Sequence, residues 1–334
     1  MRILFVASGH GPHKEMAPFT RAQASSLRRI GLTINSFPIE GQGLRAYVRA
    51  IPQLRKYLRE NPPDVIHAHY SLSGWVAVAA RPRQPIVLSL MGTDAYGEYV
   101  GENKVIPQSR LLTLLTWLIQ PFVQKIICKS ANIAAYSYRP GITEILPNGV
   151  ELDKFELLPH EATRKALGLR PDRRYVLFLG DPKNPRKNVA LARRAISLLQ
   201  RDDVELLLPY PIPHSEVVRY FNAADAFVLC SYMEGSPNVV KEAMACNCPL
   251  VVTDVGDAAW LVGDEPGCYV ASFDPADFAQ KLELALQFGS KGQRTGGRER
   301  LHTLGLEAGQ VADRLKTIYH SLGRATPQKA RAGS

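Results

Sequence analysis

Long apolar runs are scarce in this chain of 334 residues. The longest, Leu111–Cys128, is interrupted by polar residues and a proline, so we expect a buried helix followed by a strand, not a membrane span. Near the N-terminus, Ile3–Ala7 is too short for the apolar region of a secretory signal, and no small-residue cleavage site follows it. We therefore expect a cytoplasmic protein.

Cysteine is also sparse, and its odd number in a large chain argues against a disulfide framework. Cys246 and Cys248 have no nearby partners at metal-ligand spacing, so we expect no metal there. We interpret all five as reduced core residues: Cys128, Cys230, Cys246, Cys248 and Cys268.

Acidic residues are depleted in the first half of the chain. Residues 1–150 hold 17 Lys and Arg against 8 Asp and Glu, which is +9 of the chain's formal charge of +10. A basic half beside a neutral half indicates two modules with different partners, for which an anionic membrane surface, an anionic acceptor and nucleic acid are candidates. No zinc-finger, helix-turn-helix or aromatic-basic motif is present, so we expect no nucleic acid.

One segment of the basic half, Leu44–Arg59, has helical periodicity with an apolar face and several Arg and Lys elsewhere. Such a helix can lie on anionic lipid at the inner face of the cell membrane, or it can pack one face on a sheet and solvate the other. Pro52 is expected to kink or split it.

Strand and helix patterns alternate in both halves, which predicts an α/β fold with doubly wound parallel sheets. In the first half the expected strands are Arg2–Ser8, Thr33–Ile39, Asp64–His69, Ile86–Met91, Lys125–Lys129 and Thr143–Pro147, and the expected helices are Pro18–Ile30, Leu44–Arg59, Ser73–Ala80, Pro107–Gln124 and Asn132–Tyr138. In the second half the expected strands are Tyr175–Gly180, Val204–Pro209, Ala226–Cys230, Pro249–Val255 and Cys268–Ala271, and the expected helices are Asn188–Leu199, Glu216–Ala224, Pro237–Cys246 and Pro275–Phe288.

These patterns suggest a first domain at 1–150, a linker at 151–174 and a second domain at 175–306. A terminal helix near 307–322 spaces Val311, Leu315, Ile318 and Leu322 on one face.

The loops after the first and third expected strands carry candidate binding residues. Gly9 and Gly11 allow a phosphate or sugar to approach the backbone, but Lys14 stands where the dinucleotide fingerprint has its third glycine, which argues against NAD. An ordinary turn explains the glycines equally well. His67 and His69 fall on one side of their strand, and without a third ligand we expect hydrogen-bonded structure, not zinc.

The stretch Glu234–Glu242 combines an expected strand, a short loop and an expected helix. Ser236 suits the N-cap and Pro237 the first helical position, while Gly235 allows close approach of a ligand. Free N–H groups at the helix start favour phosphates, and the two glutamates can accept hydrogen bonds from hydroxyls on either side. A nucleotide-sugar has this arrangement of groups; isolated solvent-exposed charges are the alternative.

The segment EGSPNVVKEAMACNCPLVVTDVGD resembles the glutamate–seven–glutamate signature of retaining glycosyltransferases of family 4, which have the GT-B fold of two Rossmann-like domains facing a cleft. The resemblance implies that Glu234 faces the donor sugar and Glu242 bonds the ribose hydroxyls. It also implies donor contacts from the residues between them, namely Gly235, Ser236, Pro237, Asn238 and Val239.

Other loops extend the resemblance. The segment DVIHAHYSLSG is similar to the family pattern at a strand end that lines the interdomain cleft, which implies that His67 and His69 lie at that cleft on the acceptor side. Met91-Gly92-Thr93-Asp94 is similar to the family's His-Gly-Thr-Asp turn, with Met91 in place of the histidine that approaches the sugar. Asp94 then suits acceptor or sugar binding, or else caps the turn. Together with Glu234 and Lys187 it makes up the expected catalytic residues. The loop after Gly180 matches the family's diphosphate-binding loop at Lys187. Asp181 stands in place of its arginine, which leaves Lys183 and Arg186 as candidates for the second positive charge.

The resemblance implies transfer of a sugar from a UDP- or GDP-linked donor to an acceptor hydroxyl. The first domain would bind a glycan or lipid-linked acceptor in cell-envelope glycan, polysaccharide or glycolipid synthesis, and the second would bind the donor. It further implies no metal or other cofactor and no protein nucleophile, because the departing phosphate takes the acceptor's proton. A sugar-nucleotide epimerase, a binding-only protein and a phosphorylase are the alternatives, although no cofactor-binding lysine for a phosphorylase can be located.

Overall fold

The computed structural model describes residues 1–10, 15–41, 43–290 and 292–324. Two compact units account for them. The first comprises Met1–Gly97, Pro107–Gly149 and the residues from Ala308 onward, and the second comprises Glu98–Ile106 and Val150–Glu307. The division differs from the sequence expectation in two places. Residues 98–106 belong to the second unit and not to the first. Residues 151–174, which were expected to form a linker, also belong to the second unit, and Phe155 lies in its core.

The first unit is built on a parallel sheet whose central strands are apolar throughout. Every residue of β4 and β5 is buried, as expected for a sheet covered on both faces. Its strands pair in the order β3-β1-β4-β5-β8-β9, with the short β2 antiparallel to the end of β1. They are β1 (Arg2–His10), β2 (Glu15–Met16), β3 (Thr33–Ile39), β4 (Val65–His69), β5 (Ile86–Leu90), β8 (Lys125–Cys128) and β9 (Thr143–Ile145).

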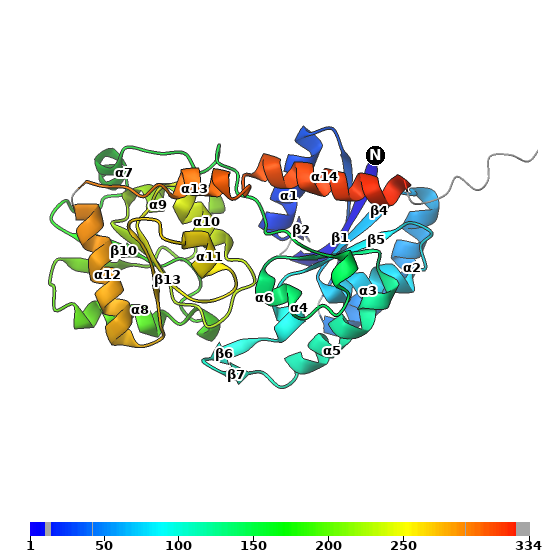
Figure 1. Cartoon of the computed structure of the whole chain (residues 1–334), viewed down its shortest axis with the longest axis horizontal. Helices are drawn as coiled ribbons and strands as arrows, with labels where there is room; N and C mark the ends of the chain where they lie inside the picture. The colour runs from blue at the N-terminus through cyan, green and yellow to red at the C-terminus, as the bar shows by residue number, and fades with distance from the viewer. Residues whose placement is uncertain (11–14, 42, 291, 325–334) are drawn as a thin grey trace, which may run out of the picture. The chain divides into compact units, whose positions relative to one another are not determined.

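Helices cover both faces of this sheet. On one face, α1 (Pro18–Arg29) and α14 (Ala308–Arg324) lie side by side, and Val311, Leu315 and Ile318 pack into the core there (Figure 1). The other face is covered by α2 (Gly43–Glu60), α3 (Ser71–Ala79), α5 (Ser109–Ile119) and α6 (Ala131–Ala134). A single turn, α4 (Thr93–Tyr96), follows β5.

Helix α2 runs through Pro52, so the proline does not split it. One expectation for these helices was wrong. Helix α5 and β8 fall where a buried helix and a strand were predicted, but α5 is not buried, because Leu111, Leu114, Trp117 and Leu118 are 42–63% exposed.

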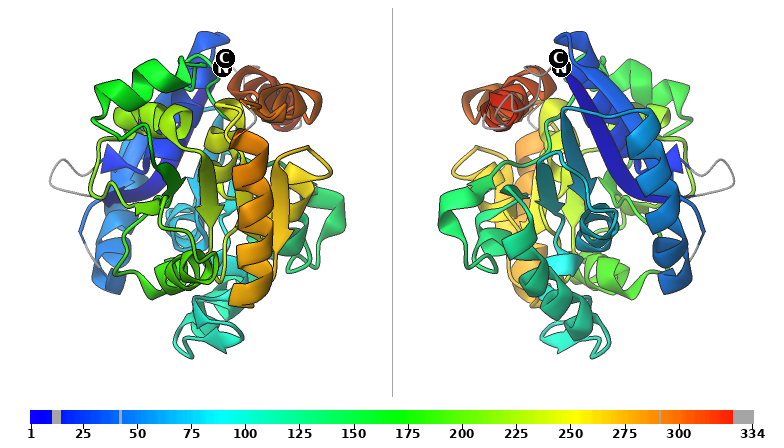
Figure 2. Two further views of the ribbon diagram at one scale, coloured as in Figure 1. Left: turned by 90° about the vertical axis from the view of Figure 1, so that its left-hand side faces the viewer. Right: turned by 90° about the vertical axis from the view of Figure 1, so that its right-hand side faces the viewer.

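The second unit has a five-stranded parallel sheet in the order β11-β10-β12-β13-β14. Helices α8 and α12 cover one face, and α9, α10, α11 and α13 cover the other; Figure 2 shows α12, in orange, alongside the strands. The strands are β10 (Arg174–Leu177), β11 (Val204–Leu207), β12 (Ala226–Leu229), β13 (Leu250–Thr253) and β14 (Cys268–Ala271). The helices are α7 (His160–Ala166), α8 (Val189–Leu198), α9 (Val217–Ala223), α10 (Asn238–Ala245), α11 (Ala258–Val262), α12 (Pro275–Ser290) and α13 (Gly297–Thr303).

A small hairpin, β6 (Tyr99–Gly101) and β7 (Lys104–Val105), also counts with the second unit. All five cysteines are buried and free, as predicted. Among the described residues, none of the helices combines the length and apolarity needed to span a bilayer.

Candidate active site

Three loops follow neighbouring strands of the second sheet. They come after β10, β12 and β13, which pair in parallel and in that order. The carboxyl ends of parallel strands meet at one edge of a sheet, which is where open α/β sheets bind ligands. The three loops carry Lys187, Glu234 and Gly256, respectively.

Glu234 lies at the centre of a charged cluster on this edge. Its Oε1 accepts hydrogen bonds from Lys187 Nζ at 2.7 Å and Ser231 Oγ at 2.9 Å, and Arg186 Nη1 lies 3.0 Å away. Burial favours the neutral acid, but the charges of Lys187 and Arg186 outweigh it and hold the pKa of Glu234 below its ordinary value. The group is therefore a carboxylate at neutral pH, and the three side chains together carry one net positive charge.

The two loops that form the cluster are joined by backbone contacts. Arg186 Nη1 donates to the Met233 carbonyl at 3.0 Å, and the Tyr232 N–H donates to the Arg186 carbonyl at 2.9 Å. Thr253, at the end of β13, donates through Oγ1 to the Ser231 carbonyl at 2.9 Å. These bonds fix where the carboxylate and the two cations stand, so their arrangement is preorganised.

Gly256 supports the loop from the third strand end. Its φ is +63°, and a Cβ placed there would lie 2.7 Å from the Gly235 carbonyl oxygen and 2.8 Å from that of Glu234. The backbone of the Glu234 loop therefore needs a glycine behind it. Gly256 was not predicted from the sequence, although a glycine directly after an apolar strand is a usable signal.

Helix α10 begins one residue later than predicted, at Asn238, with Pro237 at the N-cap position and no side-chain cap. Ser236 was expected to cap the helix, but its Oγ accepts a hydrogen bond from Lys241 Nζ at 3.0 Å instead. The buried ammonium group thus uses the hydroxyl that would have capped the helix. The N–H groups of the first turn lack partners within the helix and keep their preference for an anion.

Lys241 is 1% exposed, and burial lowers its pKa to about 8, although the nearby Asp257 opposes that shift. Burial likewise raises the pKa of Asp257, with the charge of Lys241 opposing. Neither residue was singled out from the sequence. A lysine inside the apolar pattern of α10 was the available signal.

Glu242, the fifth residue of α10, is engaged by a residue far away in the sequence. His214 Nε2 lies 3.0 Å from Glu242 Oε1, and this hydrogen bond raises the pKa of His214. The ring of Phe155 packs edge-on against the imidazole at 5.7 Å. His214 had little weight in the sequence-based predictions, because nothing in the local pattern connects it with a glutamate 28 positions later.

The candidate residues of the first unit gather at the carboxyl edge of its own sheet. His67 and His69 are buried on β4, with stacked rings 4.2 Å apart, which agrees with the predicted common side. His67 bonds Tyr319 Oη at 2.6 Å and Ser89 Oγ at 2.7 Å. Burial lowers the pKa of both histidines, and the charge of Lys129 lowers it further. His67 therefore has the hydrogen-bonded structural environment that was expected from the sequence.

Asp94 is fully buried beside that edge. Its Oδ1 accepts from the backbone N–H groups of Met91 at 2.8 Å and Gly92 at 2.9 Å, and its Oδ2 accepts from Ser71 N–H at 3.1 Å. Burial raises the pKa of Asp94 to about 6, although these N–H groups oppose the rise. This is the turn-capping alternative stated for Asp94 above, and Thr93 Oγ1 in the same turn donates to Tyr70 Oη at 3.3 Å.

The remaining predicted residues are less closely tied to the cluster. Gly9 lies inside β1 opposite Met16, so the strand extends past the expected glycine turn, and Gly11 lies outside the described residues. Gly180 has φ +138° beside the Lys187 side chain, whereas Lys183 is exposed and its N–H donates to Asp181 Oδ1. In the described ranges, three or more His, Cys, Asp or Glu do not come together as a metal site.

Comparison with known proteins supports one family for both units. Residues 3–154 match the family described as Glycosyltransferase Family 4, and residues 210–287 match Glycosyl transferases group 1. A protein of Bacillus subtilis (strain 168), provisionally named the teichuronic acid biosynthesis glycosyltransferase TuaC, is 28% identical over 61% of this chain and 57% of its own length. The D-inositol 3-phosphate glycosyltransferase of Geodermatophilus obscurus is 27% identical over 80% of this chain and 72% of its own.

Solved structures extend the similarity to the whole fold. Sucrose-phosphate synthase from Thermosynechococcus elongatus covers 97% of this chain and 99% of its own, with a TM-score of 0.78 at 20% identity. Anabaena Alr3699/HepE in complex with UDP-glucose covers 96% of this chain and 100% of its own, with a TM-score of 0.72 at 15% identity. These matches confirm the GT-B fold predicted from the sequence, and the chain belongs to the group 1 and family 4 glycosyltransferases.

Proposed function

We propose that this chain transfers a sugar from a nucleotide diphosphate donor to an acceptor hydroxyl, with retention at the anomeric carbon. The observation that carries the proposal is the charged cluster in the second unit, where Lys187 and Arg186 surround Glu234 at a loop leading into α10. Departing diphosphate needs cationic or N–H stabilisation, and this edge offers two cations and an uncapped helix start. The chain spans 57% of its Bacillus subtilis relative, so the activity of that protein is carried over only as part of this proposal.

Each charged group has a role that its surroundings suit. Lys187 and Arg186 would neutralise the diphosphate as the bond to the sugar breaks. Glu234, held as a carboxylate, would accept hydrogen bonds from the donor sugar, and Glu242 would accept them from the ribose hydroxyls. His214 Nε2 lies 3.0 Å from Glu242 Oε1. When the nucleotide binds, His214 would therefore either give up this hydrogen bond or share the carboxylate with the ribose hydroxyls.

The first unit would bind the acceptor. Asp94 is inaccessible behind three backbone N–H groups, so we assign it a positioning role, in which it holds the turn Met91–Thr93. A glycan or lipid-linked acceptor in cell-envelope synthesis fits the name of the teichuronic acid relative, and a UDP-sugar donor fits the UDP-glucose bound in the HepE complex. Contact of this basic unit with an anionic membrane surface is part of the same proposal.

The experiment is titration of the full chain with UDP, GDP and ADP, followed by incubation with a panel of radiolabelled sugar-nucleotides. Glu242→Gln should weaken nucleotide binding, since hydrogen bonds to charged groups contribute about 1.5–3 kcal/mol, or roughly 10- to 100-fold in Kd. Glu234→Gln should lower turnover while leaving the nucleotide Kd nearly unchanged. Glu299→Gln, an exposed change on α13, is the matched control.

The products distinguish the alternatives. A transferase hydrolyses the donor slowly without acceptor and releases free nucleotide. A changed sugar with the nucleotide retained, or a glycal, indicates an epimerase, and saturable binding without turnover indicates a binding protein. Either result, or an unchanged nucleotide affinity in Glu242→Gln, would count against the proposal.

A further inference from the structure

Helix α5 exposes an apolar stripe where a helix on a protein surface normally has polar residues. Leu111, Leu114, Leu118 and Phe122 follow one another at helical spacing along the helix and the turn after it, and are 42–63% exposed. Trp117, 50% exposed, flanks them. Five of the exposed large apolar side chains of the described residues thus fall within a single short segment, a concentration that marks a binding surface.

The stripe is held outward by the packing of the opposite face of the helix. Thr116 and Ile119 are buried, and Trp75 of α3 donates through Nε1 to the Leu115 carbonyl at 3.0 Å. The Trp75 ring also lies 5.9 Å from that of Phe122. Rotation of the helix to bury the stripe would break these contacts, so its exposure is a property of the folded unit.

Arginines surround a hollow formed by the last turns of α2 and the residues that follow α3. It has a volume of about 630 Å³ and is lined by Arg55, Arg59, Arg81 and Arg83, with no carboxylate in its lining. Arg55 is fixed by a hydrogen bond from Nη2 to the Ala79 carbonyl at 2.9 Å. Four guanidinium groups without a lining acid make a site of high positive potential, which favours phosphate-bearing ligands.

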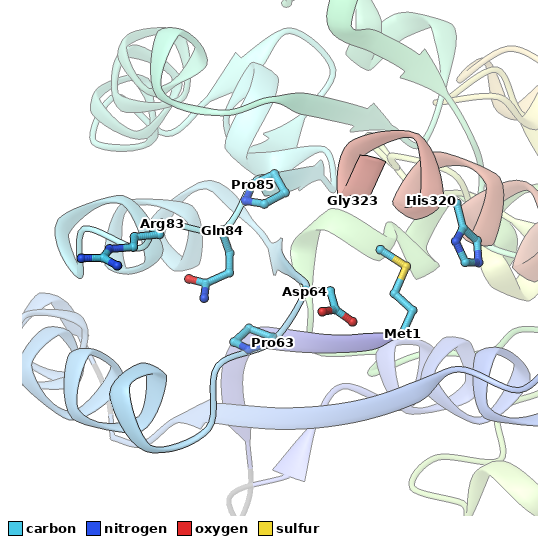
Figure 3. A pocket seen from close by; sticks show the side chains of 8 residues that line it. All are labelled: Met1, Pro63, Asp64, Arg83, Gln84, Pro85, His320 and Gly323. Carbon is cyan, nitrogen blue, oxygen red and sulfur yellow. The ribbon is translucent and has the colours of Figure 1, made fainter. Parts of the chain in front are cut away.

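The stripe and the arginines are continuous. A second hollow, of about 430 Å³, is lined both by Phe122 and Val78 and by Arg81 and Arg83. A third, shown in Figure 3, shares Arg83 and Gln84 and is lined on its other side by Met1, Asp64 and His320. The loop between α3 and β5 therefore brings positive charge to the edge of the apolar surface.

We propose that this docking face, formed by Leu111, Leu114, Trp117, Leu118 and Phe122 with Arg59, Arg81 and Arg83, binds the surface of an anionic lipid bilayer. The apolar side chains enter the boundary between headgroups and acyl chains, and the arginines bind lipid phosphates beside them. The stripe includes Trp117, and the tilted ring of Tyr138 lies 4.7 Å from it. Both residues suit the interfacial region of a membrane, where Trp and Tyr are favoured.

This inference deepens the membrane contact in the proposed function by assigning it to particular residues. Helix α2, for which lipid contact was one of two alternatives from the sequence, supplies only Arg59 to the docking face. Its test measures binding and not turnover, so failure of the glycosyl-transfer proposal would leave it standing. The full chain is sedimented with vesicles of phosphatidylcholine alone and with vesicles in which about a third of the lipid is phosphatidylglycerol. We expect binding to the anionic vesicles only, weakened by salt because exposed charges are screened.

Two variants separate the components of the face. Arg81→Gln with Arg83→Gln should lower the partition coefficient roughly 10-fold or more, at about 1 kcal/mol for each cation near the surface. Leu111→Ser with Leu114→Ser should lower it by a similar factor without removing the salt dependence. The matched controls, Arg193→Gln with Arg194→Gln on α8 and Leu284→Ser on α12, are exposed in the second unit and should bind as the wild type does.

Trp117 reports insertion directly. Trp75 and Trp117 both remain in a Trp260→Phe background. Anionic vesicles should shift the emission of that variant to shorter wavelength, brominated lipid should quench it, and a further Trp117→Phe change should abolish both effects. Equal binding to both vesicle types, no effect of either paired variant, or an unshifted Trp117 would overturn the proposal. So would a dimer of the wild type that the leucine variants dissociate while vesicle binding is absent, since a second copy would then be the occupant.

Discussion

Glu234 keeps a negative charge at the candidate site although it is nearly buried. Its carboxylate is nearly buried, with 14% of the side chain exposed, yet it keeps its charge because two cations adjoin it. In the absence of a donor, those cations are partly neutralised by the glutamate. The cluster has one net positive charge and would therefore attract the diphosphate of a donor. It would also stabilise the negative charge that develops on the diphosphate as its bond to the sugar breaks.

Lys187→Met should destabilise the protein and change its dependence on pH. The pKa of Glu234 is depressed in the folded state, so its ionisation stabilises the fold above the ordinary value of about 4.3, and this contribution is lost as pH falls through the folded pKa. Without Lys187, the charge of Arg186 and the hydrogen bond from Ser231 are left to oppose the effect of burial on the pKa of Glu234. We expect a loss of about 1–3 kcal/mol at pH 7 and a shallower decline below pH 5, measured by urea unfolding. An unchanged acid decline would contradict the assigned pairing.

Gly256→Ala should damage the Glu234 loop. The added Cβ would lie 2.7 Å from the Gly235 carbonyl oxygen, at a φ of +63°, so the loop must move or the backbone must strain. We expect a loss of about 1–3 kcal/mol in unfolding free energy, together with weaker nucleotide binding by calorimetry. Gly168→Ala is the control, because its φ is +68° but nothing lies within 4 Å of the added Cβ. If both variants lose the same stability and neither loses binding, the contact has no role in holding the loop.

In helix α10, a single residue of the first two turns determines how the helix begins. Lys241 reaches back to Ser236 and removes the hydroxyl from its expected capping role. The cost is a cation in the core, which is visible in its lowered pKa. The helix start is therefore left without a side-chain cap at the place where the phosphates of the donor are proposed to bind.

Lys241→Met should abolish a rise in stability with pH that the wild type shows between about pH 8 and pH 10. The pKa of Lys241 is about 8 in the folded protein and about 10.4 in an unfolded chain, so between these values the unfolded chain binds more protons and stability rises with pH. Relative to the variant, the wild type should gain on the order of 2 kcal/mol between pH 8 and pH 10 in urea unfolding. A constant difference between the two proteins over that range would contradict the buried position of the cation.

Sequence patterns predicted most elements and fewer of the contacts between them. The buried strands and amphipathic helices have clear apolar periods, and their bounds agree within a few residues. The β6–β7 hairpin was missed because Tyr99–Val105 is short and has no apolar run. Burial of α5 was predicted wrongly because hydrophobicity alone does not indicate whether an apolar stripe faces the core or a partner. The His214–Glu242 contact joins two segments whose approach depends on the folded sheet, so no local pattern could indicate it.

At the scale of the whole chain, the first unit is assembled from distant segments. Its sheet is covered on one face by α14, whose Tyr319 is fully buried and bonds His67 at 2.6 Å. Without that helix, apolar residues of the sheet such as Ile3, Phe5 and Val65 would lose part of their cover. The unit is therefore complete only when segments near the two ends of the sequence have met.

A fragment of residues 1–149 should not fold cooperatively by itself. We expect it to aggregate or to lack a near-ultraviolet circular dichroism signal, and expect a version fused through a flexible linker to residues 308–324 to recover a sharp unfolding transition. Tyr319→Phe in the full chain is a milder test, because it orphans a buried histidine nitrogen and should cost about 1–3 kcal/mol. A cooperative, monomeric 1–149 fragment would show that α14 is dispensable.

The return of α14 to the first sheet also has a consequence for synthesis on the ribosome. Protein domains usually fold in the order in which they are translated. Here the half made second, residues 150–307, is nearly continuous and can mature while the half made first still waits for its closing helix. During that interval the sheet face that α14 later covers is exposed to solvent, so the nascent first half is prone to aggregation until the helix has been made.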